Sequence, residues 1–112
     1  MSDPRLNRSL VLEGPLQAAD GAGGYTRDWQ PLGILWAAVK AGTGSDRNSA
    51  GGQLSRVPYR IIVRAAPYGA PSRPTPGQRF RDGARIFLIT AVAEAGTDAR
   101  FLTCHAEEEV AR

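Results

Sequence analysis

The segment Asp20–Gly24, with the sequence DGAGG, separates a short apolar run, Leu10–Leu12, from a longer one that ends in Ile34–Val39. Glycine adopts positive φ at no steric cost, so three glycines in four positions allow the chain to reverse sharply. The sequence therefore predicts that this loop joins two antiparallel strands and lies exposed at the tip of their hairpin.

Outward from this hairpin, alternating short apolar runs dominate over helical periodicity and are separated by glycine and proline. The pattern predicts six strands: Arg8–Glu13, Tyr25–Lys40 with a bend at Pro31, Val57–Ala65, Gln78–Arg81, Arg85–Ala93 and Arg100–His105. A chain of 112 residues fits one domain, residues 1–112. The fold class we expect is all-β, a small antiparallel β-barrel of about six strands with one long flexible loop.

Two aromatic or apolar features refine this expectation. In the strand after Asp82-Gly83, Phe87 and Ile89 face one side, whereas Ile86, Leu88 and Val92 face the other. Apolar residues on both faces predict cover on both sides, given either by a central position in the barrel or by a neighbouring subunit.

If the indole of Trp36 is buried, Trp36→Ala should lower the free energy of unfolding by roughly 3–5 kcal/mol.

The long loop is residues 42–55, with the sequence GTGSDRNSAGGQLS. It has almost no apolar content to bury, which predicts a structureless insertion, and such insertions in compact domains are usually functional. The alternative is a surface loop without a role. The candidate gate residues are Gly42, Gly44, Asp46, Arg47, Asn48, Gly51 and Gly52.

The formal net charge is only +3, which does not by itself indicate nucleic-acid binding. Arginine pairs with carboxylates across interfaces as readily as with phosphates. The candidate inter-subunit contacts are Arg60, Arg64, Arg79, Arg81 and Arg85 with Glu107, Glu108 and Glu109. The alternative is that the acidic run is a solvated chain end.

Catalytic chemistry finds little support in the sequence. Cys104 and His105 are adjacent on a predicted strand, so they face opposite sides and cannot act as a nucleophile and its base. We therefore predict no enzyme activity, no cofactor and no metal site. No apolar run approaches 18 residues and the polar N-terminus does not resemble a signal peptide, so we expect no membrane association and synthesis in the cytoplasm.

The ordered set of motifs resembles the tailed-phage head–tail joining family, also called head closure or stopper proteins. The first half of the chain contributes Arg5–Arg8, Leu10–Glu13, Asp20–Tyr25, Trp29 and Trp36–Val39 to this resemblance. The second half contributes Tyr59–Arg64, Pro76–Phe80, Gly83–Ile89 and Phe101–Glu108. The resemblance spans nearly the full length in the correct order, and it fits a phage, a prophage or a gene transfer agent.

This resemblance implies a β-barrel that assembles into a dodecameric ring below the portal and adaptor, above the tail terminator or tail tube. The ring would extend the channel for double-stranded DNA within a virion assembled in the bacterial cytoplasm. Loop 42–55 matches the loop that in this family can project into the channel and help retain DNA, and contact with a neighbouring ring is the alternative. Lys40, Arg47 and Arg56 would then lie closest to the phosphates, in contacts independent of base sequence.

Two other functions compete with this interpretation. A monomeric β-barrel could bind single-stranded nucleic acid, with Tyr25, Trp29, Tyr59 and Tyr68 as stacking platforms. A tail terminator is also a small ring-forming protein of the same particle.

Overall fold

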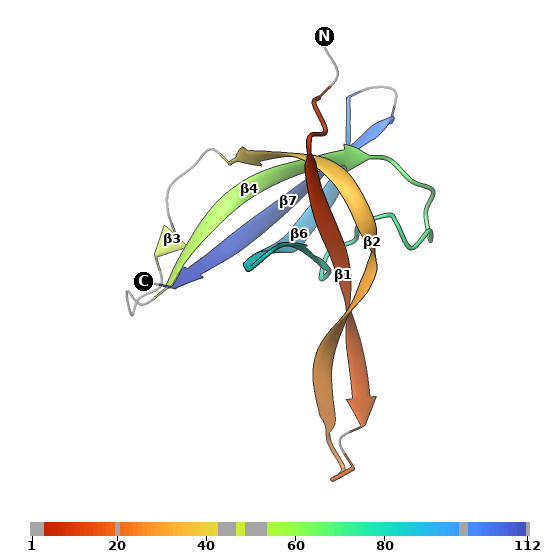
Figure 1. Cartoon of the computed structure of the whole chain (residues 1–112), viewed down its shortest axis with the longest axis vertical. Helices are drawn as coiled ribbons and strands as arrows, with labels where there is room; N and C mark the ends of the chain where they lie inside the picture. Colours follow the sequence, from red (N-terminus) through yellow and green to blue (C-terminus); the bar gives the residue numbers. More distant parts are fainter. Residues whose placement is uncertain (1–3, 20, 43–46, 49–53, 97–98, 112) are drawn as a thin grey trace.

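The computed structural model describes residues 4–19, 21–42, 47–48, 54–96 and 99–111, and within them the chain is all-β, as predicted (Figure 1). Its seven strands are β1 (Arg8–Ala19), β2 (Tyr25–Ala41), β3 (Arg47–Asn48), β4 (Leu54–Arg64), β5 (Arg79–Asp82), β6 (Arg85–Ala95) and β7 (Phe101–Ala111).

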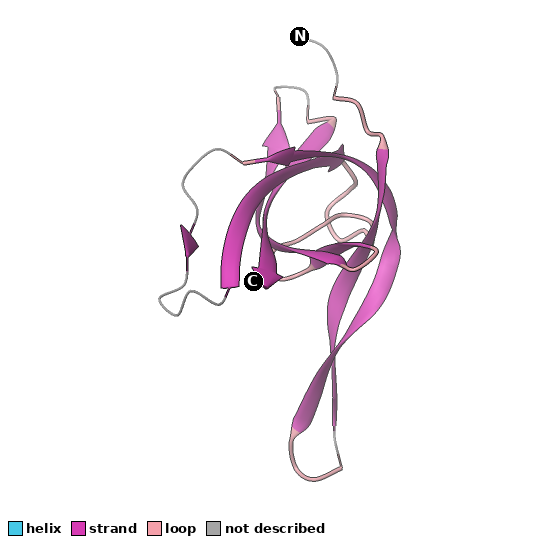
Figure 2. Ribbon diagram, turned by 60° about the vertical axis from the view of Figure 1, so that its left-hand side comes forward, coloured by secondary structure: helices cyan, strands magenta, loops and turns pink. Residues whose placement is uncertain are grey.

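Six of these strands form a closed antiparallel sheet. The hydrogen-bonded order is β2-β1-β5-β6-β7-β4, and an additional pairing between β2 and β4 joins the two ends. Figure 2 shows the resulting ring of strands around the core. The predicted barrel of about six strands is thereby confirmed. The short β3 pairs with β4 on the outside of this ring.

The core fills the inside of the ring because alternate residues of each strand point inward. Its largest members come from five strands and are Leu10, Leu12, Ile61, Val63, Phe80, Phe87, Ile89 and Leu102. The ring of Tyr59 packs edge-on against Phe87, with 5.1 Å between ring centroids. The inward face of β4 includes Tyr59, Ile61 and Val63.

The acidic run near the C-terminus lies within a strand rather than at a solvated end. We predicted that the last strand would end at His105, but β7 continues to Ala111 and pairs with β4 throughout. The strand persists because Glu108 faces inward, where Arg85 binds its carboxylate. Glu107 and Glu109 face outward on either side of it.

The two faces of β6 also differ from the prediction. Phe87 and Ile89 are buried as expected, whereas Leu88 is 44% exposed on the outer face. A register shift between Ile89 and Ala91 then places Val92 opposite Cys104, on the inner side, rather than on the face of Leu88. Such a bulge reverses the alternation for the rest of the strand.

The β1–β2 hairpin projects beyond the closed sheet as a two-stranded arm (Figure 1). A register shift after Leu12, opposite Pro31, marks its base and confirms the predicted bend. Residues 14–19 and 25–30 pair only with one another, and positive φ at Gly21 and Gly23 turns the chain at the tip. The arm raises the radius of gyration to 15.3 Å, whereas a compact domain of this length has about 13 Å.

Candidate functional site

The predicted gate loop leaves the closed sheet between the end of β2 and the start of β4. At its root, the amide of Gly42 donates a hydrogen bond to the carbonyl of Pro58 at 2.8 Å. A Cβ at Gly42 would lie 3.1 Å from Pro58, so this position favours glycine. The loop is thus anchored tightly at its first residue.

The middle of the loop is only partly described. Arg47 and Asn48 form β3 and pair with Arg56 and Ser55, and β4 begins at Leu54, so the prediction of a structureless insertion over residues 42–55 is wrong at residues 47–48 and 54–55. The candidate residues Gly44, Asp46, Gly51 and Gly52, and the side chains of Arg47 and Asn48, lie outside the described part of the chain.

The two described candidates for DNA contact, Lys40 and Arg56, lie on the strands that carry the loop. Lys40 is exposed and stands directly opposite Arg60 on the neighbouring strand. Like charges in this position repel each other, so an anion bound here would be favoured. Arg56 is 3.6 Å from the carboxylate of Glu109, and both side chains are largely exposed.

Glu13 is a buried carboxylate held by two of the predicted inter-subunit arginines. Its Oε1 accepts a hydrogen bond from Arg79 Nε at 2.7 Å, and its Oε2 accepts one from Arg81 Nε at 2.8 Å. Burial raises the pKa of Glu13, but the hydrogen bonds and charges of the two arginines outweigh burial and lower it overall. The indole of Trp29, at the base of the arm, stacks on Arg79 with 4.1 Å from guanidinium carbon to ring centroid.

Glu108 forms the second such site, at one end of the core. Arg85 donates two hydrogen bonds to its carboxylate, at 2.8 and 3.0 Å, and one to the hydroxyl of Tyr59 at 3.2 Å. The hydrogen bond from Arg85 lowers the pKa of Glu108 against the opposing effect of burial, and the same bond raises the pKa of Arg85. Through Arg85, these hydrogen bonds link Glu108 of β7 and Tyr59 of β4 to β6.

Five of the eight predicted inter-subunit residues therefore have partners within the chain: Arg79, Arg81, Arg85, Glu108 and Glu109. Arg60 and Arg64 are exposed on the outer face of β4, and Glu107 lies on the outer face of β7. No salt bridge within the described residues involves any of these three. They are the predicted contacts whose charge is available to a neighbour.

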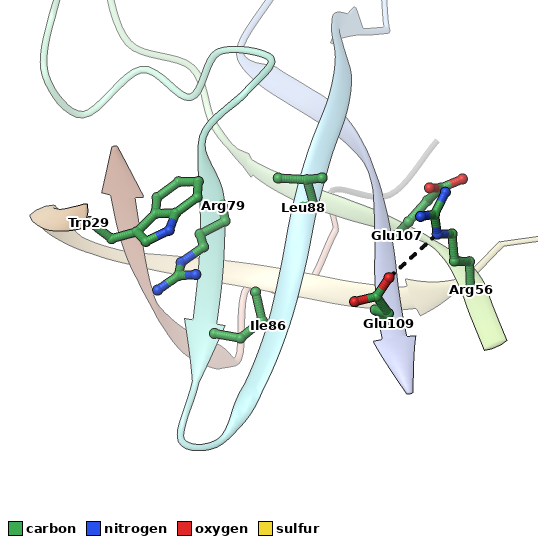
Figure 3. A pocket seen from close by; sticks show the side chains of 7 residues that line it. All are labelled: Trp29, Arg56, Arg79, Ile86, Leu88, Glu107 and Glu109. Carbon is green, nitrogen blue, oxygen red and sulfur yellow. Dashed lines mark ion pairs between the residues drawn. The ribbon is translucent and has the colours of Figure 1, made fainter. Parts of the chain in front are cut away.

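A groove of about 430 Å³ lies on the outer surface across β5, β6, β7 and β4 (Figure 3). We call it the outer groove; its lining residues are Trp29, Arg56, Arg79, Ile86, Leu88, Glu107 and Glu109. In Figure 3, Ile86 and Leu88 lie in the middle, between Trp29 with Arg79 and the acidic pair with Arg56. The groove thus has an apolar floor between two charged sides.

A second apolar surface lies on β2. Ile34 is 70% exposed and Trp36 59% exposed, and their i, i+2 spacing puts both on the outer face. Burial of the indole, the condition for a large cost of Trp36→Ala, is therefore not met, because Leu35 and Ala37 face the core instead. The pairing of β2 with β4 ends at Ala37 and Val63, and the next residue of β4, Arg64, is exposed with its guanidinium 5.5 Å from the ring centroid of Phe101. We call Ile34, Trp36 and Arg64 the β2 flank.

The aromatic residues considered as stacking platforms for a single strand mostly contact other side chains, and Tyr68 is 82% exposed. Arg79 stacks on Trp29, Arg73 stacks on Tyr68 at 3.8 Å, and Tyr59 packs in the core against Phe87. The side chain of Tyr25 lies outside the described part of the chain. The described aromatic residues therefore give little support to base stacking.

Cys104 and His105 face opposite sides of β7, as predicted. Burial raises the pKa of the Cys104 thiol to about 12, so the thiolate that reacts is scarce at neutral pH. Within the described residues there is no group of three or more His, Cys, Asp or Glu side chains able to hold a metal ion. No helix among those residues is long and apolar enough to cross a membrane.

Sequence reasoning missed Glu13 and the exposure of the β2 flank. The spacing of Arg79 and Arg81 puts both guanidinium groups on one face, which signals a shared carboxylate, but only the β1–β5 pairing identifies it as Glu13. Both faces of β2 are apolar around Trp36, so the alternation of residues does not show which face points outward.

The closed sheet exposes apolar surfaces, while its buried charges are paired. These features together are typical of a subunit that binds other proteins. The chain belongs to the phage head completion protein family, whose model matches residues 1–109. It is also similar to a chain in a solved structure described as the virion of a native gene transfer agent particle. That chain is 55% identical, with a TM-score of 0.86, and the match covers 98% of this chain and 100% of the other. No curated protein matches this chain.

Proposed function

We propose that this chain is a structural component of the head–tail connector in a gene transfer agent or a related phage-like particle. Copies form a ring, dodecameric by the family resemblance, below the portal and adaptor and above the tail terminator or tail tube. The observation that carries the proposal is the 55% identity, over essentially the whole of both chains, to a chain of a gene transfer agent virion. Membership of the phage head completion family supports the same structural role.

We further propose that loop 42–55 lies toward the DNA channel and helps retain packaged double-stranded DNA. The tight anchor at Gly42 supports a loop that emerges in a fixed direction from the sheet. Lys40, opposed by Arg60, offers positive charge at its root, and Arg56 pairs with β3 within it. Contacts from Lys40, Arg47 and Arg56 to phosphates would be independent of base sequence and weakened by salt.

A monomeric nucleic-acid-binding protein is the weaker candidate, because Trp29, Tyr59 and Tyr68 already have partners on their rings. A tail terminator is also disfavoured, since the family match describes head completion.

Deletion of the gene in the particle-producing cell tests the structural role. We expect full heads and separate tails in electron micrographs, and restored joining when the chain is supplied in trans. Normal tailed particles without the chain would contradict the proposal.

Loop function is tested by deleting residues 44–52, with a glycine–serine segment of the same length as the matched control. We expect both variants to join heads to tails. If the loop closes the channel by its specific contacts, both variants should lose nuclease-protected DNA. If length alone suffices, only the deletion should lose it. Full retention of DNA by the deletion variant would contradict a gate at this loop.

A further inference from the structure

We propose that neighbouring copies of this chain join head to tail, with the β2 flank of one copy seated in the outer groove of the next. The inference rests on the proposed function, which requires a ring of identical copies, and it names the two surfaces that make the ring. The apolar side chains Ile34, Trp36 and Leu88 of these surfaces are exposed in the isolated chain.

The central apolar residues of the two surfaces, Trp36 on β2 and Leu88 on β6, lie on opposite strands of the closed sheet. Going round the six strands, β2 is separated from β6 by β1 and β5 in one direction and by β4 and β7 in the other. A ring of many identical copies requires two different surfaces that face nearly opposite ways. A twofold dimer would instead use one surface twice. The topology therefore gives the chain the geometry of a ring subunit.

The two surfaces also match in shape and polarity. Ile34 and Trp36 project from β2 with most of their surface in solvent, whereas Ile86 and Leu88 form the floor of a hollow. A groove of about 430 Å³ has room for an indole and an aliphatic side chain. Tryptophan is among the residues that contribute most to binding when they enter such a pocket.

Charge supports the same pairing. Leu88 stands directly opposite Glu107. Arg64 follows Val63, the partner of Ala37, and its exposed guanidinium lies over the ring of Phe101 at 5.5 Å. The two arginines of the groove already have carboxylate partners, Arg79 with Glu13 and Arg56 with Glu109. Glu107 is left to attract a cation from outside, and Arg64 on the β2 flank supplies one.

The test joins the two surfaces covalently in assembled particles. Ile34→Cys and Leu88→Cys are combined in one full-length chain, which is incorporated into particles and treated with a short bis-maleimide. Native Cys104 is buried, so the two new thiols are the reactive ones. We expect a ladder of crosslinked products at multiples of 12.0 kDa on a denaturing gel.

Controls distinguish head-to-tail contact from other arrangements. Particles assembled from a mixture of the two single-cysteine chains should give dimers but no longer products. The pair Tyr68→Cys with Leu88→Cys, in which Tyr68 is exposed outside both surfaces, should give no ladder. A ladder from this control pair, or crosslinks of the first pair to a different virion protein, would overturn the inference.

A charge exchange keeps the inference testable if the cysteine chain fails to assemble. Arg64→Glu and Glu107→Arg should each lower the yield of joined particles by roughly tenfold or more, and the double variant should restore most of it. Absence of rescue together with absence of a ladder would overturn the pairing of these surfaces. If this pairing fails but the wild-type chain is present in the connector, the proposed function stands. If the wild-type chain is absent from purified particles, the proposed function and the pairing both fail.

Discussion

The β1–β2 arm and the closed sheet share two strands but are stabilised in different ways. Inside the ring, Leu10 and Leu12 of β1 are fully buried against side chains from the other strands. Beyond the bulge at Glu13, residues 14–19 and 25–30 pair only with one another, and Leu16 is 44% exposed. A two-stranded hairpin without other cover is marginally stable in water. The difference indicates that the closed sheet carries most of the stability of the fold, whereas the arm adds little to it.

Phe87→Ala should have the largest effect on the isolated chain. It empties space at the centre of the core and removes the ring that packs against Tyr59, so we expect a loss of about 3–5 kcal/mol in the free energy of unfolding. Denaturant titration measures the loss. Leu16→Ala, in the arm, is the control and should change stability by about 0.5 kcal/mol or less. An equal loss from both variants would break the distinction between sheet and arm.

Arg85→Met should rank second. It leaves the nearly buried carboxylate of Glu108 without its charged partner. Because Arg85 is partly exposed, water screens the pair, and we expect a loss of about 1–3 kcal/mol rather than that of a fully buried pair. Arg56→Met is the control: it removes the exposed pair with Glu109 and should cost about 0–1 kcal/mol. Equal costs would mean that burial of Glu108 contributes nothing.

The pH dependence of stability should follow from both buried carboxylates. The pKa values of Glu13 and Glu108 are lowered in the folded chain, so their stabilisation is complete above the unfolded value of about 4.3. It is lost as the pH falls through the lower, folded pKa values. We expect urea titrations to show falling stability below about pH 5. The double variant Glu13→Gln with Glu108→Gln should show a shallower fall, and an unchanged slope would contradict this assignment.

Arg79→Met tests the junction between sheet and arm. It removes one hydrogen bond to Glu13 and the guanidinium that stacks on Trp29, while Arg81 keeps the other hydrogen bond. We expect a global loss of only about 1 kcal/mol. Amide hydrogen exchange should quicken in residues 14–30 and stay unchanged in β4 and β7. Uniform quickening across the chain would show that the arm and the sheet unfold together.

The sequence predicted the parts of the fold that depend on alternation and on glycine. The hairpin at Asp20–Gly24, the inner face of β4 and the six-stranded ring all follow from residue types that favour one local geometry. The reversal at Val92 was not predicted, because a bulge leaves no mark in an apolar run. The extension of β7 was not predicted either, since the strand depends on Arg85 from a distant position.

The sequence indicated which residues could form ion pairs, but not which residue pairs with which. The sequence identified Arg79, Arg81 and Arg85 as arginines that need carboxylates, and the structure supplies those carboxylates from the same chain. Pairing of this kind depends on which strands become neighbours, and strand order is a long-range property. For the same reason the outer groove, assembled from four strands and the base of the arm, has no continuous signal in the sequence.

Trp36→Ala should have the smallest effect on the isolated chain and separates folding from assembly. A tryptophan in the core would cost about 3–5 kcal/mol on removal, but the indole of Trp36 is 59% exposed and its neighbours Leu35 and Ala37 face inward. We therefore expect a change of about 1 kcal/mol or less in the free energy of unfolding. Joining of heads to tails should fall sharply in the same variant, because the indole is the largest side chain of the β2 flank. A large loss of stability would place the indole against the core, whereas an unchanged stability with normal joining would remove Trp36 from the interface.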